Sequence, residues 1–229
     1  MANDVSVMRT EKKYGITWAQ QSILVHRLPL MIRPDENGSA GGYWVRSLYF
    51  DSIYDQDYFD KINGLEFCRK IRLRVYSADQ ENVKLELKQK QGAVQRKRSL
   101  LITRKLAGEM IQGNYFGLLD LDSVLAAELY QMLETGVYRP KCIVEYHRTA
   151  FAEAGNDIRI TFDSEIGASH VCEDFFKKEL SLLPVRKEPV MEVKYNGFLL
   201  SSVKQMLGFA DVSELAVSKY MMSRQILVQ

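Results

Sequence analysis

The sequence predicts an α+β fold in which a mainly antiparallel sheet of about eight strands closes into a β tunnel covered by helices. Three observations lead to this prediction. Segments with strand composition form two groups, and helical segments separate them. Within the strand segments, apolar residues occupy every second position. The positions between these apolar residues are mostly Lys, Arg and Glu, which is an unusual composition for the polar face of a sheet.

Length and composition predict one globular domain over residues 1–229. Hydrophobic residues make up 46% of the chain and charged residues 26%, which excludes an intrinsically disordered protein. The net charge is only +2, because 31 Lys and Arg nearly balance 29 Asp and Glu. This balance argues against a nucleic-acid-coating surface, and we predict no nucleic-acid partner. It is compatible with a basic interior.

The cysteines and the N-terminal segment indicate a cytoplasmic protein. Cys68, Cys142 and Cys172 are odd in number, lie far apart and include no CxxC pair, which argues against a zinc site and a disulfide framework. The first residues lack the apolar core of a signal peptide. No apolar run approaches the ~18 residues of a membrane span. A membrane-bound partner would not be visible in the sequence.

Hydrophobic periodicity assigns the elements in order. A helix is expected over Thr17–Leu28, with Thr17 as its N-cap. The first group of strands, with a short helix at Asp55–Lys61, covers Tyr43–Phe50, Phe67–Ser77, Asn82–Gln91 and Ala93–Ile102. Helical spacing follows at Lys105–Gln112 and Ser123–Glu134. The second group of strands covers Lys141–Phe151, Asp157–Asp163 and Val190–Tyr195. A helix at Leu200–Leu207 and a segment at Ser213–Arg224 end the chain.

The alternating pattern places charged residues of several strands on one face. These residues are Arg72 and Arg74; Lys84, Glu86 and Lys88; Arg96 and Arg98; Arg159 and Asp163; and Glu192 and Lys194. For a single strand, a solvated outer face is the simpler explanation. Because so many strands of one small domain share the pattern, we expect their charged faces to converge inside the tunnel. Crowded cations repel each other, so this lining predicts a bound polyanion, and phosphate suits both Arg and Lys. The interspersed carboxylates suggest a divalent metal.

Nine short motifs occur in a fixed order. They are Arg9-Thr-Glu-Lys-Lys-Tyr-Gly-Ile16, Ser47-Leu-Tyr-Phe-Asp51, Ile71-Arg-Leu-Arg-Val-Tyr76, Leu85-Glu-Leu-Lys88, Arg96-Lys-Arg98, Tyr146-His-Arg-Thr-Ala-Phe151, Ile160-Thr-Phe-Asp163, Met191-Glu-Val-Lys194 and Ser218-Lys-Tyr220. Each motif is short, but together and in this order they are specific. The chain resembles the VTC (vacuolar transporter chaperone) domain of the triphosphate tunnel metalloenzyme superfamily, over about residues 9 to 224.

The resemblance implies an ATP-dependent polyphosphate polymerase, in which the γ-phosphate of ATP is transferred to a growing polyphosphate chain. It implies a catalytic set of phosphate-binding residues: Lys13, Arg72, Arg74, Lys88, Arg148 and Lys219. Arg96, Arg98 and Tyr146 would contact the nucleotide, the two arginines through its phosphates. Glu192 would hold manganese or magnesium, and Glu11 and Glu86 would orient lysines or assist the metal.

Three alternatives remain open at this point. A shift of one residue around Arg96 and Arg98 would turn Lys97 inward instead. A hydrolase of the same fold would cleave triphosphate or nucleoside triphosphate, with Glu11 or Glu86 activating water. A module that only binds polyphosphate, triphosphate or pyrophosphate would need the cations but no turnover.

Overall fold

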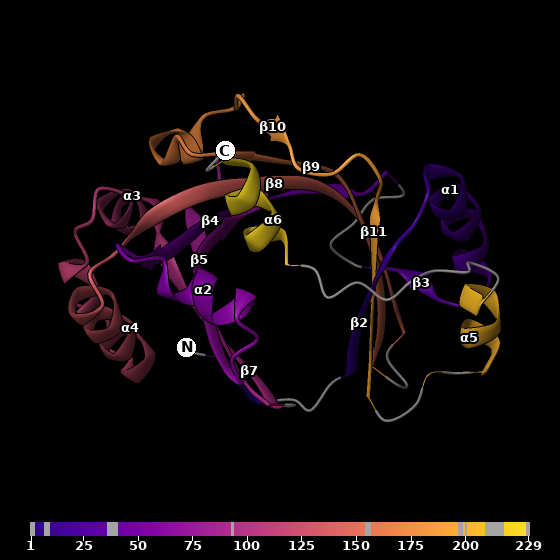
Figure 1. Ribbon diagram of the computed structural model, residues 1–229, viewed down its shortest axis with the longest axis horizontal. Helices are drawn as coiled ribbons and strands as arrows, with labels where there is room; N and C mark the ends of the chain where they lie inside the picture. The colour runs from indigo at the N-terminus through magenta and orange to yellow at the C-terminus, as the bar shows by residue number, and fades with distance from the viewer. Residues whose placement is uncertain are drawn as a thin grey trace.

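A computed structural model of the chain describes residues 3–6, 10–35, 41–92, 94–153, 157–196, 199, 201–208 and 218–227. Figure 1 shows a strongly curved sheet, with α1, α3, α4 and α5 on its outer side and α6 beneath the arch. The predicted α+β class and the curled antiparallel sheet are confirmed. No helix among these residues is long and apolar enough to span a membrane.

The sheet follows the order β1-β7-β6-β5-β4-β8-β9-β11-β2, while β3 pairs with β8 and β10 with β9. The strands are β1 (Asn3–Ser6), β2 (Thr10–Gly15), β3 (Arg33–Pro34), β4 (Tyr43–Ser52), β5 (Phe67–Val75), β6 (Asn82–Gln91), β7 (Val94–Thr103), β8 (Tyr138–Glu153), β9 (Ile158–Ser169), β10 (Leu183–Pro184) and β11 (Val190–Tyr195). Lys88 on β6 lies 3.3 Å from Glu11 on β2, although β5, β4, β8, β9 and β11 separate the two strands along the sheet. The sheet therefore curls until the side chains of its two ends meet.

Within the described residues, six helices and three short 3₁₀ turns accompany the sheet. They are α1 (Trp18–Arg27), α2 (Gln56–Ile62), α3 (Arg104–Ile111), α4 (Val124–Thr135), α5 (Ser201–Gly208) and α6 (Lys219–Leu227), with η1 (Leu28–Leu30), η2 (Phe116–Leu118) and η3 (Cys172–Phe176). The predicted N-cap of α1 is confirmed: the Thr17 hydroxyl accepts from the Gln20 amide at 3.2 Å. The Gln20 side chain in turn accepts from the Thr17 amide, which completes a capping box.

Two apolar clusters cover the convex side of the sheet. In the first, Leu106 and Met110 of α3 and Leu129 of α4 pack on Ile71 and Leu87 of β5 and β6. In the second, α1 and α5 pack on β9, β11 and the segment after β2. Figure 1 shows α3 and α4 at one end of the arch and α1 and α5 at the other. These clusters fix which face of each strand turns outward.

A third apolar cluster lies on the concave side and explains the position of α6. It consists of Val45, Tyr49, Cys142, Val144, Tyr146, Ile166, Val190 and Tyr220. Tyr220 of α6 stacks on Tyr49 of β4, with ring centroids 5.0 Å apart. The concave face is therefore divided: α6 covers an apolar part, and the remaining part carries charged side chains. Cys142 lies in this cluster, and Cys68, Cys142 and Cys172 are all buried and free.

Some element boundaries differ from the predicted ones. β8 starts at Tyr138 rather than at Lys141, and β9 continues to Ser169 beyond the predicted end at Asp163. The pattern of β9 is interrupted because Glu165 has a φ of 52° and the register with β8 shifts between Glu145 and His147. Such a β-bulge changes which face the following residues occupy, so simple alternation ends there. In the final predicted segment, residues 213–217 lie outside the described residues.

Candidate functional site

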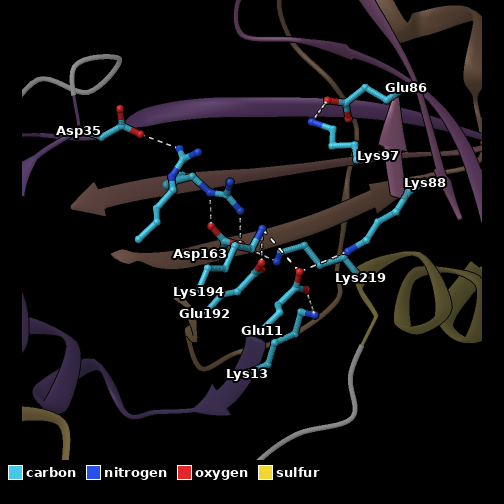
Figure 2. A network of polar contacts seen from close by, with 12 residues as sticks. Glu11, Lys13, Asp35, Glu86, Lys88, Lys97, Asp163, Glu192, Lys194 and Lys219 are labelled. Atoms are coloured by element: carbon cyan, nitrogen blue, oxygen red, sulfur yellow. Dashed lines mark hydrogen bonds and ion pairs between the residues drawn. The ribbon is translucent and has the colours of Figure 1, made fainter. Parts of the chain in front are cut away.

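Charged side chains from seven strands and from the start of α6 gather on the concave side. We call this set the charged belt; it consists of Glu11, Lys13, Lys70, Arg72, Arg74, Lys84, Glu86, Lys88, Lys97, Arg148, Arg159, Asp163, Glu192, Lys194 and Lys219. In Figure 2, side chains from different strands of the belt point toward one another. Basic side chains clearly outnumber carboxylates, so the belt is cationic.

Strand pairing explains why these residues share a face. Residues directly opposite each other in an antiparallel pair point to the same side of the sheet. Arg72 lies opposite Glu86, and Lys88 lies opposite Lys97. Their sequence neighbours Ile71 and Leu87 also lie opposite each other and are buried beneath α3 and α4. Burial of the apolar set therefore forces the charged set onto the concave side.

Glu86 lies at the centre of a group of three cations. Arg72 Nε donates to its carboxylate at 2.6 Å, Arg74 Nε lies 3.8 Å away, and Lys97 forms a further ion pair. Arg72 also donates to the Tyr49 hydroxyl at 3.0 Å. Burial acts to raise the pKa of Glu86, but Arg72, Arg74 and Lys97 outweigh burial and hold it well below its usual range. Glu86 therefore stays ionised and holds these cations in place.

Glu11 and Glu192 form a second group with three lysines. Lys13 Nζ lies 2.5 Å from Glu11, and Lys194 Nζ lies 2.7 Å from Glu192 and 3.6 Å from Glu11. Lys88 reaches Glu11 from across the tunnel. Burial and Glu192 act to raise the pKa of Glu11, but Lys194, Lys88 and Lys13 outweigh them and lower it to about 2. The pKa of Glu192 is also held well below its usual range, against the effect of burial, by Lys194, Lys13 and Lys219.

The low pKa of Glu11 predicts how stability depends on pH. Because the pKa is depressed in the folded protein, the ion pairs of Glu11 stabilise the fold fully above its ordinary value of 4.5 and are lost as the pH falls toward about 2. We expect Glu11→Gln to lower the free energy of unfolding at pH 6 by about 1–3 kcal/mol. Urea titrations along a pH series should show this difference shrinking below pH 4.5. An equal difference at every pH would contradict the assignment.

The third group centres on Asp163, which is fully buried. Arg148 donates to both of its carboxylate oxygens, at 2.7 and 2.8 Å, and Lys219 Nζ lies 2.5 Å away. Arg148 and Lys219 both lie against the Tyr146 ring, 5.2 and 4.8 Å from its centroid. Tyr146 is only 3% exposed, so in this arrangement its ring supports two cations and offers no open face to a base.

Helix α6, which carries Lys219, is anchored to the start of α2. The buried carboxylate of Asp51 accepts from the Tyr220 hydroxyl at 2.6 Å and from the amides of Asp57 and Tyr58 at 2.9 and 3.0 Å. Asp55 forms a bidentate ion pair with Arg224, with distances of 2.7 and 2.8 Å. These contacts fix the position of α6, and therefore of Lys219, through residues that do not belong to the charged belt.

The predicted inward orientation of Arg96 and Arg98 is wrong, and the alternative register with Lys97 inward is the one observed. Arg98 turns to the convex side, where it donates to Glu128 of α4 at 2.6 Å and to Gln89 at 2.8 Å. Arg96 lies opposite Gln89 and shares the face of Arg98, since the two are two residues apart on one strand. Lys97 forms an ion pair with Glu86 in the belt.

The six residues predicted as catalytic, Lys13, Arg72, Arg74, Lys88, Arg148 and Lys219, all lie in the charged belt, and so does Glu192. Four further lysines and one arginine were not on that list: Lys70, Lys84, Lys97, Lys194 and Arg159. For Lys70, Lys84, Lys194 and Arg159 the signal was present in the alternation, because each shares a strand face with a residue predicted to point inward. Lys70, for example, lies two positions before Arg72. Lys97 instead lies on the face opposite to Arg96 and Arg98.

Two carboxylates of the charged belt, Glu11 and Glu192, could serve as ligands of a metal ion. Within the described part of the chain, no group of three or more His, Cys, Asp or Glu side chains is arranged to hold a metal. Asp163 is occupied by Arg148 and Lys219, whereas Glu11 and Glu192 are neighbours that share Lys194. Mg²⁺ is often held by one or two carboxylates plus phosphate oxygens of the substrate. The donor set therefore fits an ion that shares its coordination with a bound phosphate.

A curled antiparallel sheet with a cationic concave side and embedded carboxylates defines a protein of the triphosphate tunnel type. The family model of the VTC domain matches residues 8–228, and the chain belongs to this family. The Hippeastrum protein HpAC1, described as an adenylyl cyclase candidate with a dominant triphosphatase activity, has the same fold: TM-score 0.56, 13% identity, covering 96% of each chain. A Bacillus halodurans candidate adenylate cyclase gives a TM-score of 0.54 at 11% identity, covering 93% of this chain and 96% of that one. A comparison with curated protein sequences finds no match.

Proposed function

We propose that residues 1–229 form a single cytoplasmic domain that acts as an ATP-dependent polyphosphate polymerase. It transfers the γ-phosphate of ATP to the end of a polyphosphate chain inside the tunnel. The observation that carries this proposal is the charged belt, in which a line of cations on the concave face is held in place by the protein's own carboxylates. Membership of the VTC domain family supports the same function.

Phosphoryl transfer depends mainly on positioning and on neutralising charge, and needs no covalent nucleophile. Arg148 and Lys219 are fixed by Asp163, and Arg72 and Lys97 are fixed by Glu86. A planar guanidinium binds two phosphate oxygens at once, while an ammonium acts as a compact charge. The belt thus provides fixed cations along a chain of phosphates, as both ATP and polyphosphate require.

The bound metal, manganese or magnesium, would neutralise charge on the phosphates. Glu192 and Glu11 would hold it. We expect Glu192→Gln to weaken Mn²⁺ binding at least tenfold in the presence of a non-hydrolysable ATP analogue, because one of two carboxylate ligands is lost. Electron paramagnetic resonance of Mn²⁺ measures this without turnover. The matched control is Glu188→Gln, which removes an exposed carboxylate outside the belt. Equal Mn²⁺ affinity in both variants would exclude Glu192 as a ligand.

The electrostatics favour transfer over hydrolysis. A general base works best when its pKa is near the operating pH. The pKa of Glu11 is about 2 and that of Glu86 is held still further below its usual range, so both carboxylates are weak bases. Neither is suited to activating water. Hydrolysis remains the second candidate because HpAC1, which shares the fold, is described as a triphosphatase.

The deciding experiment incubates the purified protein with ATP and Mn²⁺ and measures polyphosphate on a gel together with free phosphate. A ladder of polymer without matching release of phosphate supports the polymerase. Free phosphate or pyrophosphate without polymer would identify a hydrolase. Binding of ATP or polyphosphate with neither product would identify a binding module.

A further inference from the structure

Three lysines lie side by side across neighbouring strands of the belt. Lys70 on β5 lies opposite Lys88 on β6, and Lys88 lies opposite Lys97 on β7. Two of them have a carboxylate: Lys88 pairs with Glu11, and Lys97 pairs with Glu86. For Lys70, the part of the chain that the structure describes supplies no carboxylate in ion-pair contact. A cation without an anionic partner in a row of cations is electrostatically unfavourable until an anion binds.

The four charged groups that act most strongly on Lys70 are all cations. These groups are Lys88 from β6, Lys13 from β2, Arg72 from its own strand and Lys61 from α2. Burial lowers the pKa of Lys70 most, and these four cations lower it further, to about 7. The contact that Lys70 makes is with a neutral group: its Nζ donates to the Ser218 hydroxyl at 2.7 Å.

Among the described residues, no acceptor takes the hydroxyl hydrogen of Ser218, which lies beside this lysine. Ser218 directly precedes α6, and its Oγ accepts from the Met221 amide at 3.4 Å as well as from Lys70. Because both contacts use the oxygen as acceptor, the hydroxyl hydrogen is available to a ligand. Lys70 and Ser218 therefore offer an ammonium and a hydroxyl at one point, next to Lys219.

We propose that Lys70 and Ser218 form a further phosphate-binding position, which extends the charged belt toward α6. Its ligand is a phosphoryl group of the polyphosphate or nucleotide chain. The inference rests on the proposed function in taking a phosphate chain as the ligand, but it does not require turnover. A phosphate oxygen supplies the anion that Lys70 lacks, so the ammonium form is favoured in the complex. Binding of the chain at neutral pH is therefore accompanied by uptake of a proton at Lys70.

Isothermal titration calorimetry with tripolyphosphate, without metal, tests this inference on the full chain. Titrations at pH 7.5 in two buffers of different ionisation enthalpy measure the number of protons taken up. Lys70→Met removes the cation, and Lys70→Arg keeps a cation that is always protonated. Lys105→Met is the control, because Lys105 is exposed on α3 at the convex side. Thermal unfolding of each variant checks that it folds.

We expect Lys70→Met to weaken tripolyphosphate binding by about tenfold and to reduce proton uptake. Lys70→Arg should keep the affinity of wild type but also reduce the proton uptake. The comparison of the two variants therefore separates the effect of the positive charge from the effect of side-chain packing. The control should match wild type in both. If folded Lys70→Met binds with the affinity and proton uptake of wild type, Lys70 is not a phosphate ligand. If wild type binds tripolyphosphate but makes no polymer from ATP, the proposed polymerase fails while this inference stands. If wild type does not bind tripolyphosphate, both fail.

Discussion

Lys219→Met will lower kcat/KM for polyphosphate synthesis by about 100-fold or more while the protein stays folded. The expected loss corresponds to removal of one fixed cation from the place where phosphoryl charge develops. Lys219 Nζ lies against Asp163 and the Tyr146 ring, at the point where α6 meets the charged belt. The fold should tolerate the change because Arg148 keeps both of its hydrogen bonds to Asp163, so no buried carboxylate is left unpaired.

The control for Lys219→Met is Lys204→Met on α5, where the side chain is exposed and the helix packs on the convex side. Polymer yield, the rate of ATP use and the midpoint of thermal unfolding should be measured for both variants. The control should match wild type in all three. If Lys219→Met makes polymer at the rate of wild type, Lys219 does not act on the transferred phosphate. If the midpoint of thermal unfolding of Lys219→Met lies several degrees below that of wild type, its loss of activity would reflect lower stability instead.

The curled sheet was predictable because the alternation in β5 and β6 is complete. In β5, Ile71 and Leu73 form one face while Arg72 and Arg74 form the other. A strand with apolar residues on one face needs a covering layer, and the helical segments supply it. This reasoning placed Arg72, Arg74 and Lys88 on the concave face correctly, although it said nothing of the partners that hold them.

The register of β7 was misjudged because residues 95–99 are all polar. In such a stretch, alternation alone cannot tell one face from the other. The information lay further along the strand: Leu100 and Ile102 are buried under the helices, and Arg98 shares their face. Counting back from these two residues turns Lys97 inward. A buried arginine that pairs with a helix residue such as Glu128 cannot be recognised from the strand alone.

The packing of α6 was not predictable, because its partners look like ordinary strand residues. Val45 and Val144 face the concave side, where the charge pattern of the other strands predicts only phosphate-binding residues. β4 is buried on both faces over most of its length, with α6 on one side and the cluster beneath α3 and α4 on the other. Only the three-dimensional arrangement shows that one part of the concave face is apolar and holds a helix.

The anchoring of α6 leads to the second large effect, at Asp51. We expect Asp51→Ala to lower the free energy of unfolding by about 3–5 kcal/mol. Four donors would lose their acceptor at once: the amides of Ser52, Asp57 and Tyr58 and the hydroxyl of Tyr220. Tyr220→Phe removes only one of these bonds and keeps the stacking on Tyr49, so it should cost about 1–2 kcal/mol. Urea denaturation measures both values.

Asp60→Ala is the matched control, since it removes a carboxylate from α2, the helix whose first amides donate to Asp51. Among the described residues, the Asp60 side chain bonds only to Gln56, in an exposed pair. Its effect should stay within about 0.5 kcal/mol. Because Tyr220 follows Lys219 directly, Tyr220→Phe should also lower the rate of synthesis more than its effect on stability explains, with Asp60→Ala unchanged. An Asp51→Ala protein as stable as Asp60→Ala would show that α6 is held by its apolar contacts and by the Asp55–Arg224 pair instead. The position of Lys219 would then depend on packing rather than on the buried carboxylate.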